Sequence, residues 1–274
     1  MRPYGFVISR RLLTFLAAGF LTISAQNVAA PTAGLTRAQK EEFLLKAKIV
    51  NTKSAPKGIT NTVRATLSDG KLTHDASIQS IDDTKHNYLG ELIFRDSWKF
   101  DVAAYKLDRL LGLNMIPTAV ERSYNGSHSS FTWWIDDVLM DEDQRQARKA
   151  QAPDQARWND QMCIVNVFDN LIYNVDENKG NEIYDKNWDL WEIDKSRSFR
   201  SNTSLLDPKL LTRCDSALLE KLKQLDAATL KKELGGYDVG DMQIKGLLAR
   251  RDKIVKFFED KGPSSMYTSP RRPE

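Results

Sequence analysis

The chain has 274 residues, of which 41% are hydrophobic and 28% charged, the composition of an ordinary soluble domain. This length suits one large domain or a two-lobed unit. The 40 basic and 37 acidic residues leave a net charge of +3, a near balance that argues against a nucleic-acid partner. The two cysteines, Cys163 and Cys214, leave two alternatives open: a disulfide in an oxidising compartment, or two buried small apolar residues.

Residues 1–30 have the order of regions that is typical of a secretory signal. Basic residues, including Arg10 and Arg11, precede an apolar run from Leu12 to Ile23, and small residues follow up to Ala30. The arginine pair is also similar to a twin-arginine signal. The run is short for a membrane span. We therefore expect an exported protein, periplasmic or secreted, with no stable span once the signal is cleaved. Because Pro31 disfavours cleavage after Ala30, an uncleaved N-terminal membrane anchor is the alternative.

The first half of the remaining chain is predicted to be rich in strands. Thr36 is a candidate N-cap for a helix that runs to Lys48. Strands are expected at 48–52, 62–67, 72–81, 118–124 and 130–136, with one longer helix at 98–112. Asp69-Gly70 and Asn125-Gly126 are typical hairpin turns. Residues 82–87 are expected to form a polar loop.

The second half is predicted to be mainly helical. Helices are expected at 144–149, at 160–173 and over most of 208–261, and two short strands at 182–184 and 190–193. The predicted fold class is therefore α+β in two lobes. The expected parts are a signal peptide (1–30), an N-terminal helical extension (31–47), a strand-rich N-lobe (48–137), a helical C-lobe (138–261) and a disordered tail (262–274).

A polar loop between a buried helix and a hairpin carries the candidate chemistry. Asp176 and Asn181 lie five positions apart in this loop, and Asp194 follows the second strand of the hairpin. Phosphoryl transfer requires a carboxylate that orients the acceptor hydroxyl, and hard oxygen ligands for Mg²⁺ on the nucleotide phosphates. This spacing is that of kinase-like sites, whereas an Asx-rich turn is the alternative interpretation of the loop alone.

Two blocks of the sequence resemble one group of atypical kinases. The first is the run from Ala103 to Pro117, A-A-Y-K-L-D-R-L-L-G-L-N-M-I-P, and the second comprises Asp169 to Asn181 with Ile193 to Phe199. They resemble blocks of the secreted Four-jointed-like and Golgi casein kinases, the HipA-type kinases and the type II phosphatidylinositol 4-kinases. The resemblance implies a two-lobed protein-kinase-like fold with a strand-rich N-lobe that holds one long helix.

The resemblance also implies roles for individual residues. Asp176 corresponds to the catalytic base that orients the acceptor, and Asn181 and Asp194 correspond to metal ligands. Asp169 corresponds to a residue that supports the loop, with a solvent-facing carboxylate at a helix end as the alternative. The implied reaction uses ATP or another nucleotide with Mg²⁺ or Mn²⁺. Its acceptor would be a hydroxyl group of a protein, a glycan or a small molecule.

On the first-lobe side of the site, some positions match the pattern of these kinases and others depart from it. Trp134, Ile135 and Asp136 correspond to the inter-lobe strand whose backbone binds adenine, with core packing as the alternative for the pair Trp133 and Trp134. Gln79 and Asp101 stand where the family has the lysine that binds the nucleotide phosphates and the glutamate that pairs with it. An uncharged Gln cannot neutralise phosphate charge. Candidate replacements are Lys53, Lys57, Arg64, Lys71, Glu91 and Arg95.

The sequence thus predicts an exported kinase-like phosphotransferase. Two alternatives remain at this point: a catalytically silent binding or scaffold protein on a kinase fold, and a transferase that moves AMP instead of phosphate. The acceptor and the oligomeric state do not follow from the sequence.

Overall fold

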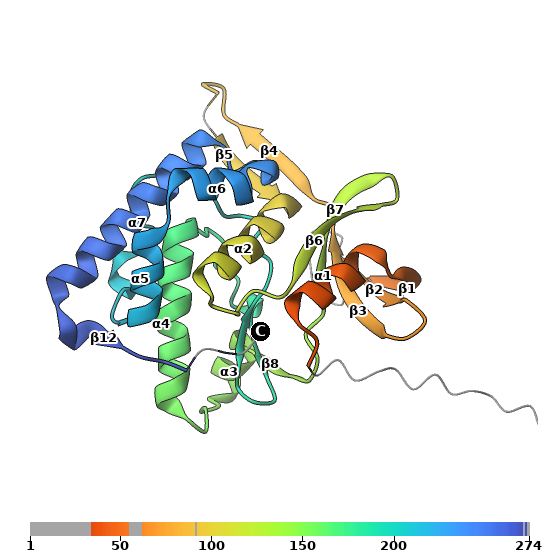
Figure 1. Ribbon diagram of the computed structural model, residues 1–274, viewed down its shortest axis with the longest axis horizontal. Coiled ribbons are helices and arrows are strands. Elements are labelled where there is room, and N and C mark those ends of the chain that lie inside the picture. The colour runs from red at the N-terminus through yellow and green to blue at the C-terminus, as the bar shows by residue number, and fades with distance from the viewer. Residues whose placement is uncertain (1–33, 55–61, 91, 271, 273–274) are drawn as a thin grey trace, which may run out of the picture.

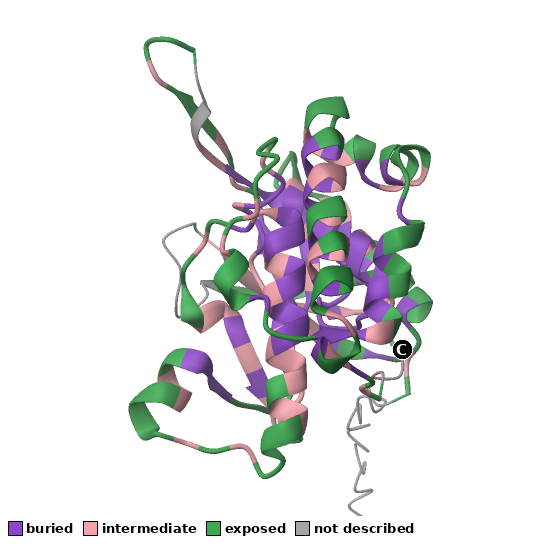
Figure 2. Cartoon of the chain, turned by 90° about the vertical axis from the view of Figure 1, so that its left-hand side faces the viewer, coloured by how far each residue is buried: buried purple, intermediate pink, exposed green. Residues whose placement is uncertain are grey.

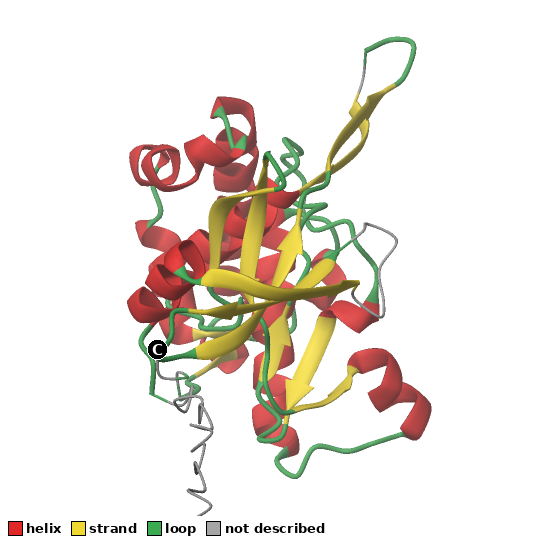
Figure 3. Cartoon of the chain, turned by 90° about the vertical axis from the view of Figure 1, so that its right-hand side faces the viewer, coloured by secondary structure: helices red, strands yellow, loops and turns green. Residues whose placement is uncertain are grey.

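The computed structural model describes residues 34–54, 62–90, 92–270 and 272. The expected signal segment, 1–30, lies outside the described residues. The strands of the first half of the chain gather on one side of the molecule and the helices of the second half on the other, with α2 (Trp98–Leu111) between them (Figure 1). Figure 3 views the molecule from the side on which the strands gather, so the yellow strands lie toward the viewer. This mixed architecture confirms the predicted α+β class.

The first half is built on a five-stranded antiparallel sheet of order β1-β2-β3-β7-β6. Its strands are β1 (Lys48–Ser54), β2 (Val63–Ser68), β3 (Thr73–Gln79), β6 (Ala119–Tyr124) and β7 (Ser127–Trp133). Successive side chains of a strand point to opposite faces, so one face of this sheet is apolar and the other polar. Ser77 lies opposite Thr132, and Gln79 opposite Ser130, on the polar face.

The helix α1 (Arg37–Lys46) covers the apolar face of this sheet. The Thr36 side chain accepts a hydrogen bond from the backbone nitrogen of Gln39, so Thr36 is the N-cap that the sequence indicates. Phe43 and Leu44 of α1 are buried in one cluster with Ala65, Leu67, Ala76, Ile78 and Phe131 of the sheet. Burial of these apolar side chains fixes the extension onto the N-lobe.

The segment after α2 is held by one buried carboxylate. Asp108 is fully buried, and its two oxygens accept hydrogen bonds from the backbone nitrogens of Asn114 (3.1 Å), Met115 (2.8 Å) and Ile116 (3.1 Å). The same carboxylate binds Arg37 of α1 at 2.7 Å. Asp108 therefore joins three parts of the fold: α1, α2 and the turn that follows Gly112.

The predicted loop at 82–87 is wrong, because this stretch is a strand. β4 (Asp82–His86) pairs with β5 (Leu92–Ser97) in a hairpin that projects from the body of the molecule (Figure 2). The polar sequence lacks an apolar face because the hairpin extends into solvent and covers no core. At its base, the backbone nitrogen of Ser97 donates to the carbonyl of Ser196 at 2.9 Å. The hairpin thus ties the start of α2 to the chain beyond Asp194.

The second half combines a small sheet with a helical bundle. The sheet has the order β10-β9-β8. Its strands are β8 (Val138–Asp141), β9 (Glu182–Asp185) and β10 (Leu190–Glu192), and the helices are α3 (Glu142–Arg148), α4 (Gln155–Ile172), α5 (Ser216–Gln224), α6 (Ala227–Leu234) and α7 (Asp241–Lys261). The buried core of this half includes Phe168, Leu247 and Ile254 and continues into α2. Within the described ranges, no helix is long and apolar enough to cross a membrane.

Residues 262–270 have a defined structure, although they belong to the tail that is expected to be disordered. β12 (Met266–Tyr267) pairs in parallel with β11 (Cys214–Asp215), and the hydroxyl of the buried Tyr267 donates to the carbonyl of Asp160 at 2.7 Å. Farther on, Arg272 donates to the carbonyl of Leu190 at 2.7 Å. A polar, proline-containing tail is thus held by one aromatic anchor and by backbone pairing. Cys163 and Cys214 are buried thiols, the second of the two alternatives.

Candidate active site

A cleft of about 460 Å³ lies between the polar face of the sheet and the loop after α4. Gln79, Asp101, Trp134, Ile135, Asn181 and Asp194 all line it, so the fold brings together six of the eight predicted site residues. Asp176 joins them through a hydrogen bond from Asn181 Nδ2 to its Oδ2 at 3.3 Å. Asp136 is turned away and pairs with His74 at 2.9 Å, half exposed.

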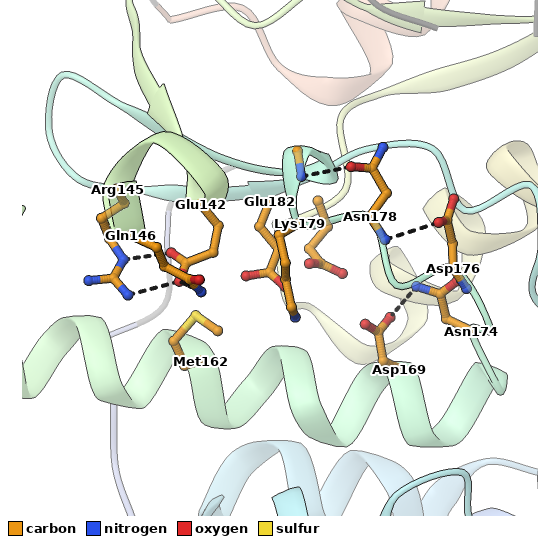
Figure 4. A network of polar contacts seen from close by, with 12 residues as sticks. Glu142, Arg145, Gln146, Met162, Asp169, Asn174, Asp176, Asn178, Lys179 and Glu182 are labelled. Carbon is orange, nitrogen blue, oxygen red and sulfur yellow. Dashed lines mark hydrogen bonds and ion pairs between the residues drawn. The ribbon is translucent and has the colours of Figure 1, made fainter. Parts of the chain in front are cut away.

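The loop that carries Asp176 starts where α4 ends. Tyr173 caps α4 with a left-handed backbone (φ 56°), which turns the chain out of the helix. Asn174 Nδ2 donates to Asp169 Oδ1 of α4 at 3.2 Å, and Asn174 Oδ1 accepts from the backbone nitrogen of Asp176 (Figure 4). The Oδ1 of Asp176 in turn accepts from the backbone nitrogen of Asn178 at 3.1 Å. Asp169 therefore supports the loop, the role that the resemblance implies for it.

Asp194 follows β10 in a left-handed conformation (φ 51°). The backbone nitrogen of the preceding residue, Ile193, donates to the carbonyl of Asn181 at 3.0 Å, so strand end and loop are joined directly. The carboxylate of Asp194 is largely buried and accepts from the hydroxyl of Ser196 at 2.7 Å. Burial raises the pKa of Asp194, and the negative charge of Asp176 raises it further.

These donors fit a divalent cation. Asp194 and Asn181 present hard oxygen donors at the cleft, and a cation there would offset the negative charges of Asp194 and the nearby Asp176. Within the described part of the chain, no group of three or more His, Cys, Asp or Glu side chains forms a metal site by itself. A cation here would therefore complete its coordination with ligand and water oxygens, as Mg²⁺ commonly does.

Lys195 is a buried part of the site that the sequence reasoning missed. Its ammonium group forms ion pairs with Asp169 of α4, at 3.1 Å, and with the buried Glu192 of β10. Burial alone would lower the pKa of Lys195, but the charges of Asp169 and Glu192 outweigh burial and raise it. The signal in the sequence is a lysine directly after Asp194 and three residues after Glu192, but its other partner, Asp169, lies 26 residues away in the chain. Lys195 thus joins α4 to the strand that positions Asp194.

The first-lobe side of the cleft presents neutral and acidic groups. Gln79 is buried, and its Nε2 donates to the hydroxyl of Thr62 at 3.2 Å. Asp101 of α2 accepts from the backbone nitrogen of Lys195 at 2.8 Å and from the hydroxyl of Ser130 at 3.3 Å. Burial raises the pKa of Asp101 well above its ordinary value, and the charge of Asp194 adds to the effect. Gln79 and Asp101 thus form two separate hydrogen-bonded groups and no ion pair with each other.

The expected adenine end of the cleft is aromatic. Trp134 lines the cleft, and the guanidinium of Arg64 lies over its ring at 4.1 Å from the centroid. Trp133 is in the core and stacks on His74 at 3.8 Å between ring centroids. The alternative of core packing therefore holds for Trp133 and not for Trp134. Of the candidate replacements, Arg64 lies at this aromatic end, and Lys57 and Glu91 lie outside the described residues.

No family model matches the sequence, and no curated protein matches it significantly. Solved structures do match the fold. The match to the structure of hydra Fam20 with sugar covers 84% of this chain and 92% of the Fam20 chain, with a TM-score of 0.61 and 17% identity. A Golgi casein kinase covers 87% of this chain and 79% of its own (TM-score 0.57, 13% identity). A Golgi casein kinase structure with Mn/ADP bound covers 85% and 80% (TM-score 0.53, 13% identity). The chain therefore has an atypical kinase-like fold, similar to that of Fam20 and the Golgi casein kinase at low sequence identity.

Proposed function

We propose that this protein is a phosphotransferase that moves the γ-phosphoryl group of a nucleotide to a hydroxyl acceptor. The observation that carries the proposal is the convergence of Asp176, Asn181 and Asp194 at one end of the cleft. Three oxygen-bearing side chains from one loop and one strand end meet the needs of phosphoryl transfer for acceptor orientation and cation binding. That a Golgi casein kinase of similar fold was solved with Mn/ADP supports a nucleotide and Mn²⁺ as ligands.

In the proposed reaction, Asp176 accepts a hydrogen bond from the acceptor hydroxyl and takes its proton. The acceptor oxygen forms a bond to the γ-phosphorus while the bond from that phosphorus to the β–γ bridging oxygen breaks. The nucleoside diphosphate leaves with the electron pair of the broken bond. Asn181 and Asp194 would hold a divalent cation, which would supply positive charge to the phosphates. The hydrogen bonds that Asp176 accepts from Asn178 and Asn181 fix the position of its carboxylate within the loop.

A catalytically silent nucleotide-binding or scaffold protein is the second candidate, and one observation favours it. Gln79 and Thr62 occupy the first-lobe side with neutral groups, so the cation that kinases place on the phosphates is absent among the described residues that line the cleft from this lobe. Thermal unfolding with ATP and Mg²⁺, or with ATP and Mn²⁺, tests binding separately from chemistry, because a ligand that binds only the folded state raises its stability.

The activity test uses purified protein, Mn²⁺ or Mg²⁺, and ATP that carries its radiolabel on either the γ- or the α-phosphate. We expect label from the γ-position on the protein itself or on a panel of peptides, oligosaccharides and small alcohols. The Asp176→Asn variant should lower the initial rate by about 100-fold or more, the usual contribution of a general base. The Asp194→Asn variant should also lower it, because the cation would lose a charged ligand. Asp241→Asn, an exposed carboxylate of α7, is the matched control.

Three outcomes would contradict the proposal. Undiminished γ-label transfer by Asp194→Asn would show that this site does not carry the reaction. Transfer of the α-label would identify an AMP transferase instead. A nucleotide-dependent rise in melting temperature without any transfer would favour the silent binding protein.

A further inference from the structure

Three arginines gather beside the loop that carries Asp176. Arg95 belongs to β5, and Arg197 and Arg200 follow Asp194 in the chain. The Nη2 of Arg200 donates to the carbonyl of Arg95 at 3.1 Å. The carbonyl of Arg197 accepts from the backbone nitrogen of Val175, the residue before Asp176, at 3.4 Å. We call Arg95, Arg197 and Arg200 the arginine cluster.

The backbone next to the cluster, at residues 200–202, is held by contacts with α7. Arg250 of α7 is fully buried and donates to the carbonyl of Leu171 at 2.8 Å, to that of Arg200 at 3.0 Å and to that of Asn202. Gly246 of α7 approaches the same segment so closely that an added Cβ would lie 2.7 Å from the carbonyl oxygen of Ser201. The backbone of the cluster is therefore preorganised, as a binding site requires.

Two members of the cluster have carboxylate partners, and the third does not. Arg197 binds the buried Asp96 at 2.9 Å, and Arg95 binds Asp238 at 2.7 Å. Asp238 is half exposed and also binds Lys99 at 2.8 Å. For Arg200, which is only partly exposed, no carboxylate of the described residues lies within ion-pair distance.

Arg200 is a partly buried cation that lies near two other cations. Burial lowers the pKa of Arg200, and the positive charges of Arg95 and Arg197 lower it further, while Asp96 opposes them. A cation that is partly removed from water beside other cations lowers the stability of the fold unless an anion binds it. Such an arrangement is typical of functional sites, and arginine is the usual residue for binding phosphate and carboxylate groups.

The cluster lies on the acceptor side of the proposed reaction centre. The ion pair with Asp96 raises the pKa of Arg197, and the charges of Asp176 and Asp194 raise it further, so its guanidinium lies within electrostatic reach of both. The backbone of Arg197 is bonded to the loop of Asp176, the residue that would face the acceptor. The nucleotide, in contrast, would occupy the cleft between Trp134 and Asp194.

We propose that the arginine cluster binds a negatively charged group of the acceptor, a phosphate or a carboxylate close to the hydroxyl that receives the phosphoryl group. This inference rests on the proposed function, because an acceptor exists only if the protein transfers a phosphoryl group. Anion binding by the cluster does not require that transfer. Anion binding and acceptor recognition can therefore be tested separately.

The first experiment measures anion binding without nucleotide or divalent metal. Inorganic phosphate is titrated into the wild-type protein and into Arg200→Gln at constant ionic strength, and the melting temperature is recorded. Arg200→Gln removes no ion pair of the described residues but one hydrogen bond, to the carbonyl of Arg95, so it should fold with a small loss of stability, and each shift is measured against the same variant without phosphate. We expect its affinity for phosphate to be at least tenfold weaker. Arg213→Gln, in which an exposed arginine near β11 is lost, should bind phosphate like the wild type. Equal phosphate-induced shifts in all three proteins would overturn the inference.

The second experiment asks whether the bound anion belongs to an acceptor. Matched pairs of hydroxyl compounds are compared in the transfer assay: glycerol 3-phosphate against glycerol, and a serine peptide flanked by Glu against the same peptide flanked by Gln. We expect the wild type to prefer the charged member of a pair by at least tenfold in kcat/KM, and Arg200→Gln to lose that preference while its affinity for the nucleotide is unchanged. The pair that shows the preference distinguishes phosphate from carboxylate. Transfer without any preference would overturn the acceptor assignment, whereas phosphate binding without transfer to any compound would refute the proposed function and leave the anion site standing.

Discussion

Replacement of Asp108 by Asn tests whether one carboxylate holds the N-lobe together. Its Oδ1 accepts from Arg37 and from the backbone nitrogen of Asn114, and its Oδ2 accepts from the backbone nitrogens of Met115 and Ile116. An Asn side chain has one acceptor oxygen and one NH₂ group. In either orientation, the NH₂ group therefore faces two donors that have lost their acceptor.

The expected loss of stability follows from these contacts. An unsatisfied buried donor costs about 1–3 kcal/mol, and loss of one partner of a buried ion pair costs roughly 3–5 kcal/mol. Because the contacts share one side chain, these costs overlap, and we expect a loss of about 4 kcal/mol in the free energy of unfolding. For a chain of this size, that corresponds to a fall of roughly 10 °C in melting temperature. The assay is calorimetry together with urea unfolding of the two proteins in parallel.

The control variant separates burial from hydrogen bonding. Asp226 also accepts a backbone hydrogen bond, from Thr229 at 2.9 Å, but at an exposed helix start, so Asp226→Asn should change the melting temperature much less. A loss below about 1 kcal/mol for Asp108→Asn, the size of an ordinary hydrogen bond, would refute the reasoning. It would mean that the turn after Gly112 relaxes or admits water without cost to the fold.

Two further predictions concern the supports of the site. Gly246→Ala should destabilise the protein by about 1–3 kcal/mol in urea unfolding, because the added Cβ would meet the Ser201 carbonyl. Gly236→Ala is the control, because open space surrounds that position. Equal unfolding midpoints for the two variants would contradict the close approach. Lys195→Met should cost roughly 3–5 kcal/mol because it leaves the buried Glu192 without its cation, and the added change Glu192→Gln should restore part of that loss. If the double variant is no more stable than the single one, the ion pair is not the cause.

The sequence predicted the elements of the core well and the exposed ones poorly. The run from Ala103 to Pro117 was recognised by resemblance, and the structure supplies its physical reason, since Asp108 and Gly112 make the turn that follows α2. The hairpin β4–β5 was missed because a strand that covers no core shows no apolar alternation. The tail was expected to be disordered from its composition, and one buried aromatic, Tyr267, outweighs that signal.

In the candidate site, the features that are local in the sequence were predicted, and those that join distant residues were not. The spacing of Asp176, Asn181 and Asp194 is local, and the structure brings the three together. The ion pair of Lys195 with Asp169 and the contact of Arg200 with Arg95 join residues that are 26 and 105 positions apart, and no local pattern contains them. Long-range pairing of charges is decided by the packing of α4, β5 and β10, so it becomes visible only in the fold.

The distribution of charge around Asp194 limits what the site can bind. On the first-lobe side, Gln79 is neutral and Asp101 has a strongly raised pKa. Among the described residues, the lysine that lines the cleft, Lys195, is already paired with Asp169 and Glu192. On the other side, Arg197 and Arg200 carry positive charge next to the Asp176 loop. The charge of the nucleotide phosphates would then fall mainly to the cation at Asn181 and Asp194, which makes metal binding a condition of nucleotide binding. If ATP without divalent metal stabilised the protein as much as ATP with Mn²⁺, a protein cation would have to contact the phosphates, and this division of charge would be wrong.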